Sequence, residues 1–303
     1  MQKDNRNILV PVDFNEPSVI AANYAAQLAK GDNSEVVLLY VVETPGMFLD
    51  FFLTSDELVK IINLAKDKLT EVVAPLQEKW PGVKFNTLVE RGKPYAKILE
   101  VAEKEPVRLI VLGENHDNNE KSAELGTTVY HITLKSPVPV LTIKGNPSKI
   151  NNKIVLPLDL TRNIEKQLKA TVLYGSNHDA EVHLVSALIG GIKVRESRIF
   201  KKLKEAEKVL KENNIKTKVK LFEVSKVPPF MRILQYSEEV GADMIIVLTH
   251  QEGYTYDNYI GAFAHHIINL SKIPVLSLTA TAVDIYFENY FKMLVDPFDL
   301  TKK

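Results

Sequence analysis

One pattern of hydrophobic runs occurs twice in this chain, and this repeat limits the fold more than any other feature. Residues 8–13 read ILVPVD and residues 154–159 read IVLPLD, which sets an offset of 146 positions. Residues 139–141 and 274–276 both read PVL, at an offset of 135. A pattern that returns in the same order predicts two copies of one fold.

The two copies are expected to be separate domains, because the chain has 303 residues and roughly 100–200 residues per domain is usual. The boundary falls in the turn-rich residues 145–148, which read GNPS. This predicts a domain at 1–146, a second domain at 147–280 and a tail at 281–303. The 11 positions by which the offsets differ lie between the second and third apolar runs, where the first copy has the apolar loop 44–53.

Within each copy, apolar runs alternate with segments whose apolar residues recur at helical spacing. In the first copy the expected strands are residues 8–13, 36–42, 85–89, 108–113 and 139–143. Strands that alternate with helices predict an α/β fold with a parallel, doubly wound sheet. In such a sheet, ligands bind beyond the carboxyl ends of the strands, at the point where the strand order reverses.

The segment 108–143 contains the clearest indication of a ligand site. Its first apolar run ends on Gly113, a polar loop follows, and Gly126, Thr127 and Thr128 stand where the next helical pattern begins. Glycine lets a backbone approach a phosphate closely, and a helix start offers unpaired N–H groups with a partial positive charge. The segment therefore predicts a phosphate site.

The rest of the expected crevice comes from the ends of the first two strands. The first strand ends at Pro11, Val12 and Asp13, and the second at Val41. If the fourth strand lies beside the first, a nucleotide fits between these residues and the loop that follows Gly113. Plainer roles also exist, because Asp13 and its counterpart Asp159 fit as local backbone caps, and Gly126 and Gly261 fit as turns into a helix.

The chain resembles two tandem domains of the universal stress protein family in nearly everything except the tail. The resemblance lies in ILVPVDFNEPS at 8–18, RGKPYAKILEVAEKEPVRLIVLG at 91–113 and PVPVLTI at 137–143. Members that bind ATP carry Gly, two residues, Gly, nine residues, Gly and then Ser or Thr. Here Gly113, Gly126 and Thr127 keep that spacing, whereas His116 stands at the position of the second glycine.

The resemblance implies an adenine nucleotide alpha hydrolase-like fold. Each half would be a five-stranded parallel sheet in the order 3-2-1-4-5, and the halves would be related by a pseudo-two-fold axis at which the fifth strands meet. It also implies that ATP, accompanied by Mg²⁺, is the cofactor of the first domain. Asp13 would contact the ribose or adenine end, and the backbone of Val41 would pair with the adenine edge. The phosphates would contact Gly113, Gly126, Thr127 and Thr128, and the cofactor-binding set is completed by Pro11, Val12, Leu112, Asn115 and His116.

His116 is open to two opposite interpretations. Its ring either crowds the phosphates, so that His116→Gly tightens ATP binding, or donates to them when protonated, so that the same change weakens binding. The second copy has Leu248, Gln251, Gly261 and Ala262 at the motif positions, which leaves one glycine and no hydroxyl. The second domain is therefore expected not to bind ATP.

Three functions fit these residues. The first is a nucleotide-responsive stress protein, a regulatory module that binds ATP in its first domain, and the motif favours it. The second is an interaction protein in which both nucleotide sites are vestigial. The third is a slow ATP hydrolase, but no residue stands out as a base, so no catalytic residue is assigned and an enzyme is not expected.

Composition argues against several other classes. Lys and Arg number 38, as do Asp and Glu, so the chain lacks the basic excess that binds nucleic acid or anionic lipid. It has no cysteine, and His265 and His266 would project about 100° apart on a helix, which suits one metal ion poorly and favours surface histidines. No apolar run has the length of a signal peptide core or a membrane span, so a cytoplasmic location is expected. The apolar tail is expected to pack on its own chain, as an alternative to contacting another subunit of a homodimer.

Overall fold

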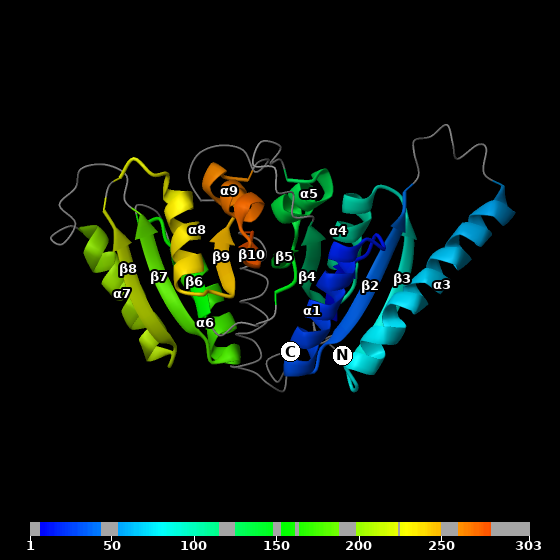
Figure 1. The fold of residues 1–303 in the computed structure, drawn as a ribbon, viewed down its shortest axis with the longest axis horizontal. Helices are drawn as coiled ribbons and strands as arrows, with labels where there is room; N and C mark the ends of the chain where they lie inside the picture. Colours follow the sequence, from blue (N-terminus) through cyan, green and yellow to red (C-terminus); the bar gives the residue numbers. More distant parts are fainter. Residues whose placement is uncertain are drawn as a thin grey trace, which may run out of the picture. The chain divides into compact units, whose positions relative to one another are not determined.

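The computed structural model describes residues 7–43, 54–114, 125–147, 153–160, 164–187, 198–223, 225–249 and 260–279 (Figure 1). The chain divides into two compact units, residues 1–118 with 126–146 and residues 119–125 with 147–303. Several predictions concern positions outside the described residues, namely those for the loop 44–53, Asn115, His116, Gln251 and the tail.

The first unit is a parallel sheet with helices on both faces. Its strands are β1 (Asn7–Pro11), β2 (Glu35–Val42), β3 (Lys84–Arg91), β4 (Val107–Glu114) and β5 (Val140–Lys144), in the order β3-β2-β1-β4-β5. Its helices are α1 (Glu16–Asp32), α3 (Ser55–Lys79), α4 (Pro94–Lys104) and α5 (Thr127–Lys135). Right-handed crossovers place α1 and α3 on one face and α4 and α5 on the other, and the helices of each pair contact one another.

The second unit repeats this arrangement among its described residues. Its strands are β6 (Lys153–Pro157), β7 (Glu181–Ala187), β8 (Lys216–Phe222), β9 (Met244–Leu248) and β10 (Val275–Leu278), in the order β8-β7-β6-β9-β10. Its helices are α6 (Glu165–His178), α7 (Arg198–Glu212), α8 (Pro229–Glu239) and α9 (Ala262–Leu270). The predicted α/β class and the order 3-2-1-4-5 are confirmed in both units.

The central strands are apolar because helices cover both of their faces. Ile8, Leu9 and Val10 of β1 are completely buried, as expected for a parallel strand inside a doubly wound sheet. The outer strand β8 differs, because its exposed Lys216, Lys218 and Lys220 alternate with less exposed residues. Lysines on an outer strand discourage pairing with other chains. No helix within the described ranges is long and apolar enough to cross a membrane.

The repeat extends to side-chain packing between helices. In the first unit, Tyr95 of α4 stacks on His131 of α5 with ring centroids 4.4 Å apart. In the second, Phe230 of α8 stacks on His266 of α9 at 4.3 Å. His265 and His266, expected on the surface, are both half-buried. His266 therefore belongs to the packing that joins α8 to α9.

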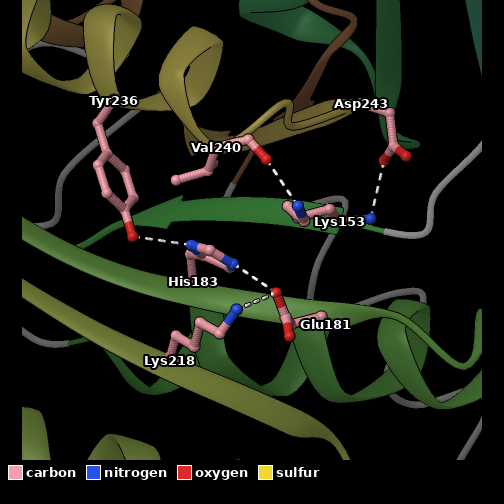
Figure 2. A network of polar contacts seen from close by, with 7 residues as sticks. All are labelled: Lys153, Glu181, His183, Lys218, Tyr236, Val240 and Asp243. Carbon is pink, nitrogen blue, oxygen red and sulfur yellow. Dashed lines mark hydrogen bonds and ion pairs between the residues drawn. The ribbon is translucent and has the colours of Figure 1, made fainter.

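A buried histidine connects α8 to the start of β7 in the second unit (Figure 2). His183 is 2% exposed; its Nδ1 lies 2.8 Å from the hydroxyl of Tyr236, and its Nε2 lies 2.7 Å from Oε1 of Glu181. Lys218 Nζ lies 3.0 Å from the same carboxylate oxygen. Burial raises the pKa of Tyr236, and the charges of Glu239 and Glu181 raise it further.

The same edge of the sheet is tied to the turn before β9. The backbone N–H of Lys153 donates to Oδ1 of Asp243 at 3.0 Å, and Lys153 Nζ donates to the carbonyl of Val240 at 2.6 Å (Figure 2). These contacts lie where the strands begin. They are therefore at the edge opposite to the carboxyl ends of the strands of the second unit.

Glu181 should make the stability of the second unit depend on pH. Hydrogen bonds from His183 and then Lys218 lower the pKa of its carboxyl below the ordinary 4.5. The stabilisation is therefore present above pH 4.5 and is lost as the pH falls through the lowered pKa. We expect Glu181→Gln to cost about 1–2 kcal/mol at pH 7 and progressively less below pH 4.5, measured by urea unfolding. A cost that stays constant down to pH 2.5 would contradict this assignment.

Candidate functional site

Most of the described site residues gather at the carboxyl edge of the first sheet. β1 lies between β2 and β4, and the crossovers change direction between β1 and β4, which is where such sheets bind ligands. Pro11 and Val12 stand at the end of β1, Val41 near the end of β2, and Leu112 and Gly113 near the end of β4. The structure therefore brings these residues to one edge of the sheet, and their role in binding a nucleotide stays a prediction.

Asp13 is exposed and is held in place by the loop that follows β1. One carboxylate oxygen accepts from the backbone N–H of Asn15 and the other from the Asn15 side chain, both at 3.1 Å. Partial burial acts to raise the pKa of Asp13, but hydrogen bonds with Ser18 and Asn15 outweigh it and lower the pKa. Asp13 thus has the local capping role considered for it, and its carboxylate lies at the carboxyl edge of the sheet.

An aromatic pair adjoins Asp13. Phe14 has φ 67°, a left-handed conformation that few residues with side chains adopt. Its ring packs against Tyr40 of β2 with centroids 4.6 Å apart, and Lys68 Nζ of α3 lies 5.5 Å from the ring centre. These three residues were not predicted as part of the site. The strained backbone at Phe14 could not be read from its residue type.

Gly113 is required by the packing of the protein itself. A Cβ atom at this position would lie 2.0 Å from the carbonyl oxygen of Pro17 and 2.8 Å from the backbone nitrogen of Ser18. The first turn of α1 therefore rests directly on the end of β4. This contact explains the glycine whether or not a phosphate binds.

Gly126 has no such explanation among the described residues. It caps α5 with φ −52° and ψ 139°, which any residue can adopt, and a Cβ atom there would meet nothing within 4 Å. Thr127 and Thr128 follow in the first turn of α5, where Thr127 is exposed and Thr128 is half-buried. A helix start with open space before it suits an anion.

Comparison with known proteins identifies the family. The model of the universal stress protein family matches residues 4–144 and again residues 151–278. The chain belongs to the universal stress protein family. Among curated members, the universal stress protein MJ0531 of Methanocaldococcus jannaschii is 29% identical over 140 residues, covering 46% of this chain and 82% of that protein.

A solved universal stress protein shares the fold of this chain along most of its length. A crystal structure from Archaeoglobus fulgidus DSM 4304 covers 91% of this chain and 99% of its own, with a TM-score of 0.74 at 19% identity. Another, a universal stress protein from Archaeoglobus fulgidus in complex with dAMP, covers 43% of this chain and 98% of its own, at 20% identity and a TM-score of 0.34.

The second universal stress protein unit keeps the strand ends of the first but changes the helix that covers them. Leu158 donates its N–H to the carbonyl of Val185 at 2.8 Å, as Val12 does to Leu39 at 2.8 Å. Leu248 occupies the place of Gly113, and α6 begins at Glu165, three positions later in the repeat than α1. A leucine has no room beneath a helix turn placed like that of α1.

At the start of α9, the backbone N–H of Gly261 is bonded to another backbone group. Its N–H donates to the carbonyl of Thr249 at 3.0 Å, and Ala262 follows it in α9. A Cβ atom on Gly261 would lie 3.7 Å from that carbonyl, which is an ordinary contact. The backbone conformation therefore does not require glycine at either helix start, Gly126 or Gly261.

Glu114 and Lys144 form a buried ion pair beside Gly126 that was not predicted. They are register partners at the ends of β4 and β5. Their side chains are 13% and 8% exposed, and Lys144 Nζ lies 3.3 Å from Oε2 of Glu114. Burial raises the pKa of Glu114, although Lys144 and a hydrogen bond from the Gly126 N–H act in the opposite direction. Glu114 stands directly after the motif glycine, and its position at a strand end was the available signal.

Proposed function

We propose that this chain is a stress-response regulatory module whose first unit binds an adenine nucleotide, with ATP as the expected ligand. The observation behind the proposal is the start of α5, where Gly126 has open space before it and Thr127 is exposed. Asp13 supplies a fixed carboxylate for the ribose or adenine end, and Val41 lies near the end of the neighbouring β2. A member of the same family has been solved in complex with dAMP, so an adenine nucleotide suits the family fold.

Mg²⁺ would arrive with ATP, bound through its phosphates. Within the described residues no group of three His, Asp or Glu side chains could hold a metal ion by itself. The proposal gives Mg²⁺ no protein site of its own. It also assigns no catalytic residue. The module would instead act through the difference between its nucleotide-bound and nucleotide-free states.

Nucleotide binding is tested by stability and by matched glycine variants. ATP present at 100 times its dissociation constant should add about 2.7 kcal/mol to the free energy of unfolding. Gly126→Val should weaken ATP binding at least about tenfold, because the new side chain enters the space that phosphates need. Gly261→Val is the control and should leave the affinity unchanged. Calorimetric titration decides the question, and equal losses in the two variants would show that the site is misassigned.

The second candidate function is an interaction protein with two vestigial sites. One observation favours it, namely that Gly113 and Asp13 each have a local structural role. Their presence can thus be explained without a ligand. Under this function ATP, AMP and adenosine would all leave the unfolding temperature of the protein unchanged.

A further inference from the structure

Three lysines form a row on the outer strand of the second unit. Lys216, Lys218 and Lys220 are exposed and alternate along β8, so their side chains lie on one face of the sheet. Lys218 Nζ lies 3.0 Å from Oε1 of Glu181 on the neighbouring β7 (Figure 2). Lys216 Nζ lies 3.3 Å from Oδ1 of Asp179, just before that strand. The first two lysines of the row therefore have carboxylate partners.

The third lysine of the row has aromatic partners instead. Lys220 Nζ lies 5.2 Å from the ring centre of Phe222 and 5.9 Å from that of Tyr236 on α8. The guanidinium carbon of Arg232, also on α8, lies 4.7 Å from the ring centre of Phe222, and its Nη1 donates to the carbonyl of Glu223 at 2.6 Å. Two cations thus share one aromatic ring. Within the described residues, neither cation forms an ion pair with a carboxylate.

The register of the two sheets shows which residues of β3 correspond to this row. Lys84 is the register partner of Glu35 in β2, and Lys216 is the register partner of Glu181 in β7. Glu35 and Glu181 are equivalent at the repeat offset of 146. The counterparts of the three lysines are therefore Lys84, Asn86 and Leu88.

Carboxylates balance the cation of α4 in the first unit but not that of α8 in the second. Lys97 Nζ of α4 lies 3.7 Å from Oε2 of Glu90 and 2.8 Å from Oε2 of Glu100. The equivalent positions in the second unit hold Arg232, Phe222 and Gln235. Over these three positions and the three of the row, the formal charge is zero in the first unit and +4 in the second. The balance of charge over the whole chain therefore conceals a local basic excess.

The backbone of β8 has an outer edge beside this row. Among the described residues, β7 is the one strand that pairs with β8 (Figure 1). An extended peptide can add to such an edge as a further strand. Alternate side chains of the added strand would lie opposite the lysines, because both repeat every two residues, and opposite charges stabilise such pairs whereas like charges destabilise them. The row that discourages pairing with a second β8 therefore favours an acidic strand.

The aromatic residues of this surface favour a peptide over a single-stranded nucleic acid. Bases bind by stacking on open aromatic faces. The ring of Phe222 is half-buried and lies beneath Lys220 and Arg232, and Tyr236 is buried. A lipid surface would attract the cations but would leave the backbone edge of β8 without a partner.

We propose that β8 binds an extended acidic segment of a partner protein, which adds to the outer edge of β8 as a strand and places Asp or Glu side chains opposite Lys216, Lys218 and Lys220. Asp179 and Glu181 already partner the first two lysines, so Lys220 contributes most of the attraction. Arg232 adds a second charge at the same end of the strand. The interaction is independent of the adenine site in the first unit.

A labelled peptide of alternating Thr and Glu tests the proposal on the full chain by fluorescence anisotropy. Lys220→Glu should weaken binding about tenfold or more, because it places a carboxylate opposite those of the peptide. Lys216→Glu should weaken binding less, since Lys216 has a carboxylate partner. Lys84→Glu is the matched control, because it makes the same change at the equivalent position of β3. It should change the affinity by less than about twofold.

A second peptide tests on the wild-type protein whether the backbone takes part. It carries an N-methyl group in place of each amide N–H and keeps every carboxylate, and it should bind at least about tenfold more weakly than the first peptide. Equal binding of the two peptides would show attraction by charge alone and would overturn strand addition. Equal affinity of wild type, Lys220→Glu and Lys84→Glu would show that the peptide binds elsewhere.

Two further probes distinguish other polyanions from an acidic peptide. These are a uridine oligonucleotide and vesicles that contain phosphatidylserine. If either binds to wild type and is lost in Lys220→Glu while the acidic peptide does not bind, the surface belongs to that class of ligand and the proposal is wrong. The proposal is also wrong if none of the probes binds.

Discussion

Replacing Gly113 with alanine is expected to destabilise the first unit by about 3 kcal/mol. The new Cβ atom would lie 2.0 Å from the carbonyl oxygen of Pro17 and 2.3 Å from its carbonyl carbon. Both are backbone atoms, so no side-chain rotation relieves the contact and the first turn of α1 must move off β4. The chain has one tryptophan, Trp80, whose Nε1 donates to Asn23 of α1 at 3.0 Å. Urea unfolding followed by its fluorescence therefore reports on this unit.

Gly126→Ala is the matched control for this loss of stability. Its Cβ atom meets nothing within 4 Å and its φ is −52°, so the change should cost no more than about 1 kcal/mol, the usual scale for a helix cap. Hydrogen exchange should show faster exchange in α1 and β4 for Gly113→Ala alone. Similar stability in the two variants would mean that α1 does not rest on Gly113.

Replacing His183 with valine is expected to destabilise the second unit by about 2–4 kcal/mol. The first unit has Val37 at the corresponding position, so the backbone tolerates the residue. The cost comes from the Tyr236 hydroxyl and the Glu181 carboxylate, which lose the ring nitrogens at 2.8 and 2.7 Å (Figure 2). A buried polar group without its partner costs more than the bond itself contributes.

A double-mutant cycle separates this effect from a loss of volume. Tyr236→Phe removes the hydroxyl and should cost about 1 kcal/mol alone. Combined with His183→Val it should cost less than the two changes added together, by about 1 kcal/mol, because the orphaned hydroxyl is gone. Circular dichroism in urea measures the stabilities, and hydrogen exchange of β7 and α8 locates the effect. Strict additivity would show that the histidine acts only by filling space.

The strand order of both units could be predicted because it depends on repetition and alternation along the chain. The roles of the motif glycines could not, since a glycine before a phosphate and a glycine beneath a helix look alike in sequence. Gly113 and Pro17 are almost a hundred positions apart, and only the packing of α1 on β4 brings their backbones together. The family resemblance assigned Gly113 to phosphate, and the structure adds a packing contact that explains the glycine without a ligand.

The ion pair beside Gly126 escaped prediction for a related reason. Glu114 directly follows the motif glycine Gly113, and Lys144 closes β5, but only the register of β4 and β5 makes them partners. Strand order alone, without the register between neighbouring strands, does not determine which residues at the strand ends lie side by side. The network around His183 is similar, since Glu181 and His183 share a strand while Tyr236 comes from α8. Periodicity along the sequence does not indicate contacts between elements, because these contacts depend on how the helices and strands pack together.

The contact between Gly113 and α1 also bears on how the two copies diverged. Leu248 requires the later start of α6, because a side chain at this strand position leaves no room for a turn placed like that of α1. Restoring glycine alone would leave the late helix start, and restoring the early helix start alone would meet the leucine. No single substitution therefore returns the second copy to the arrangement of the first at this position.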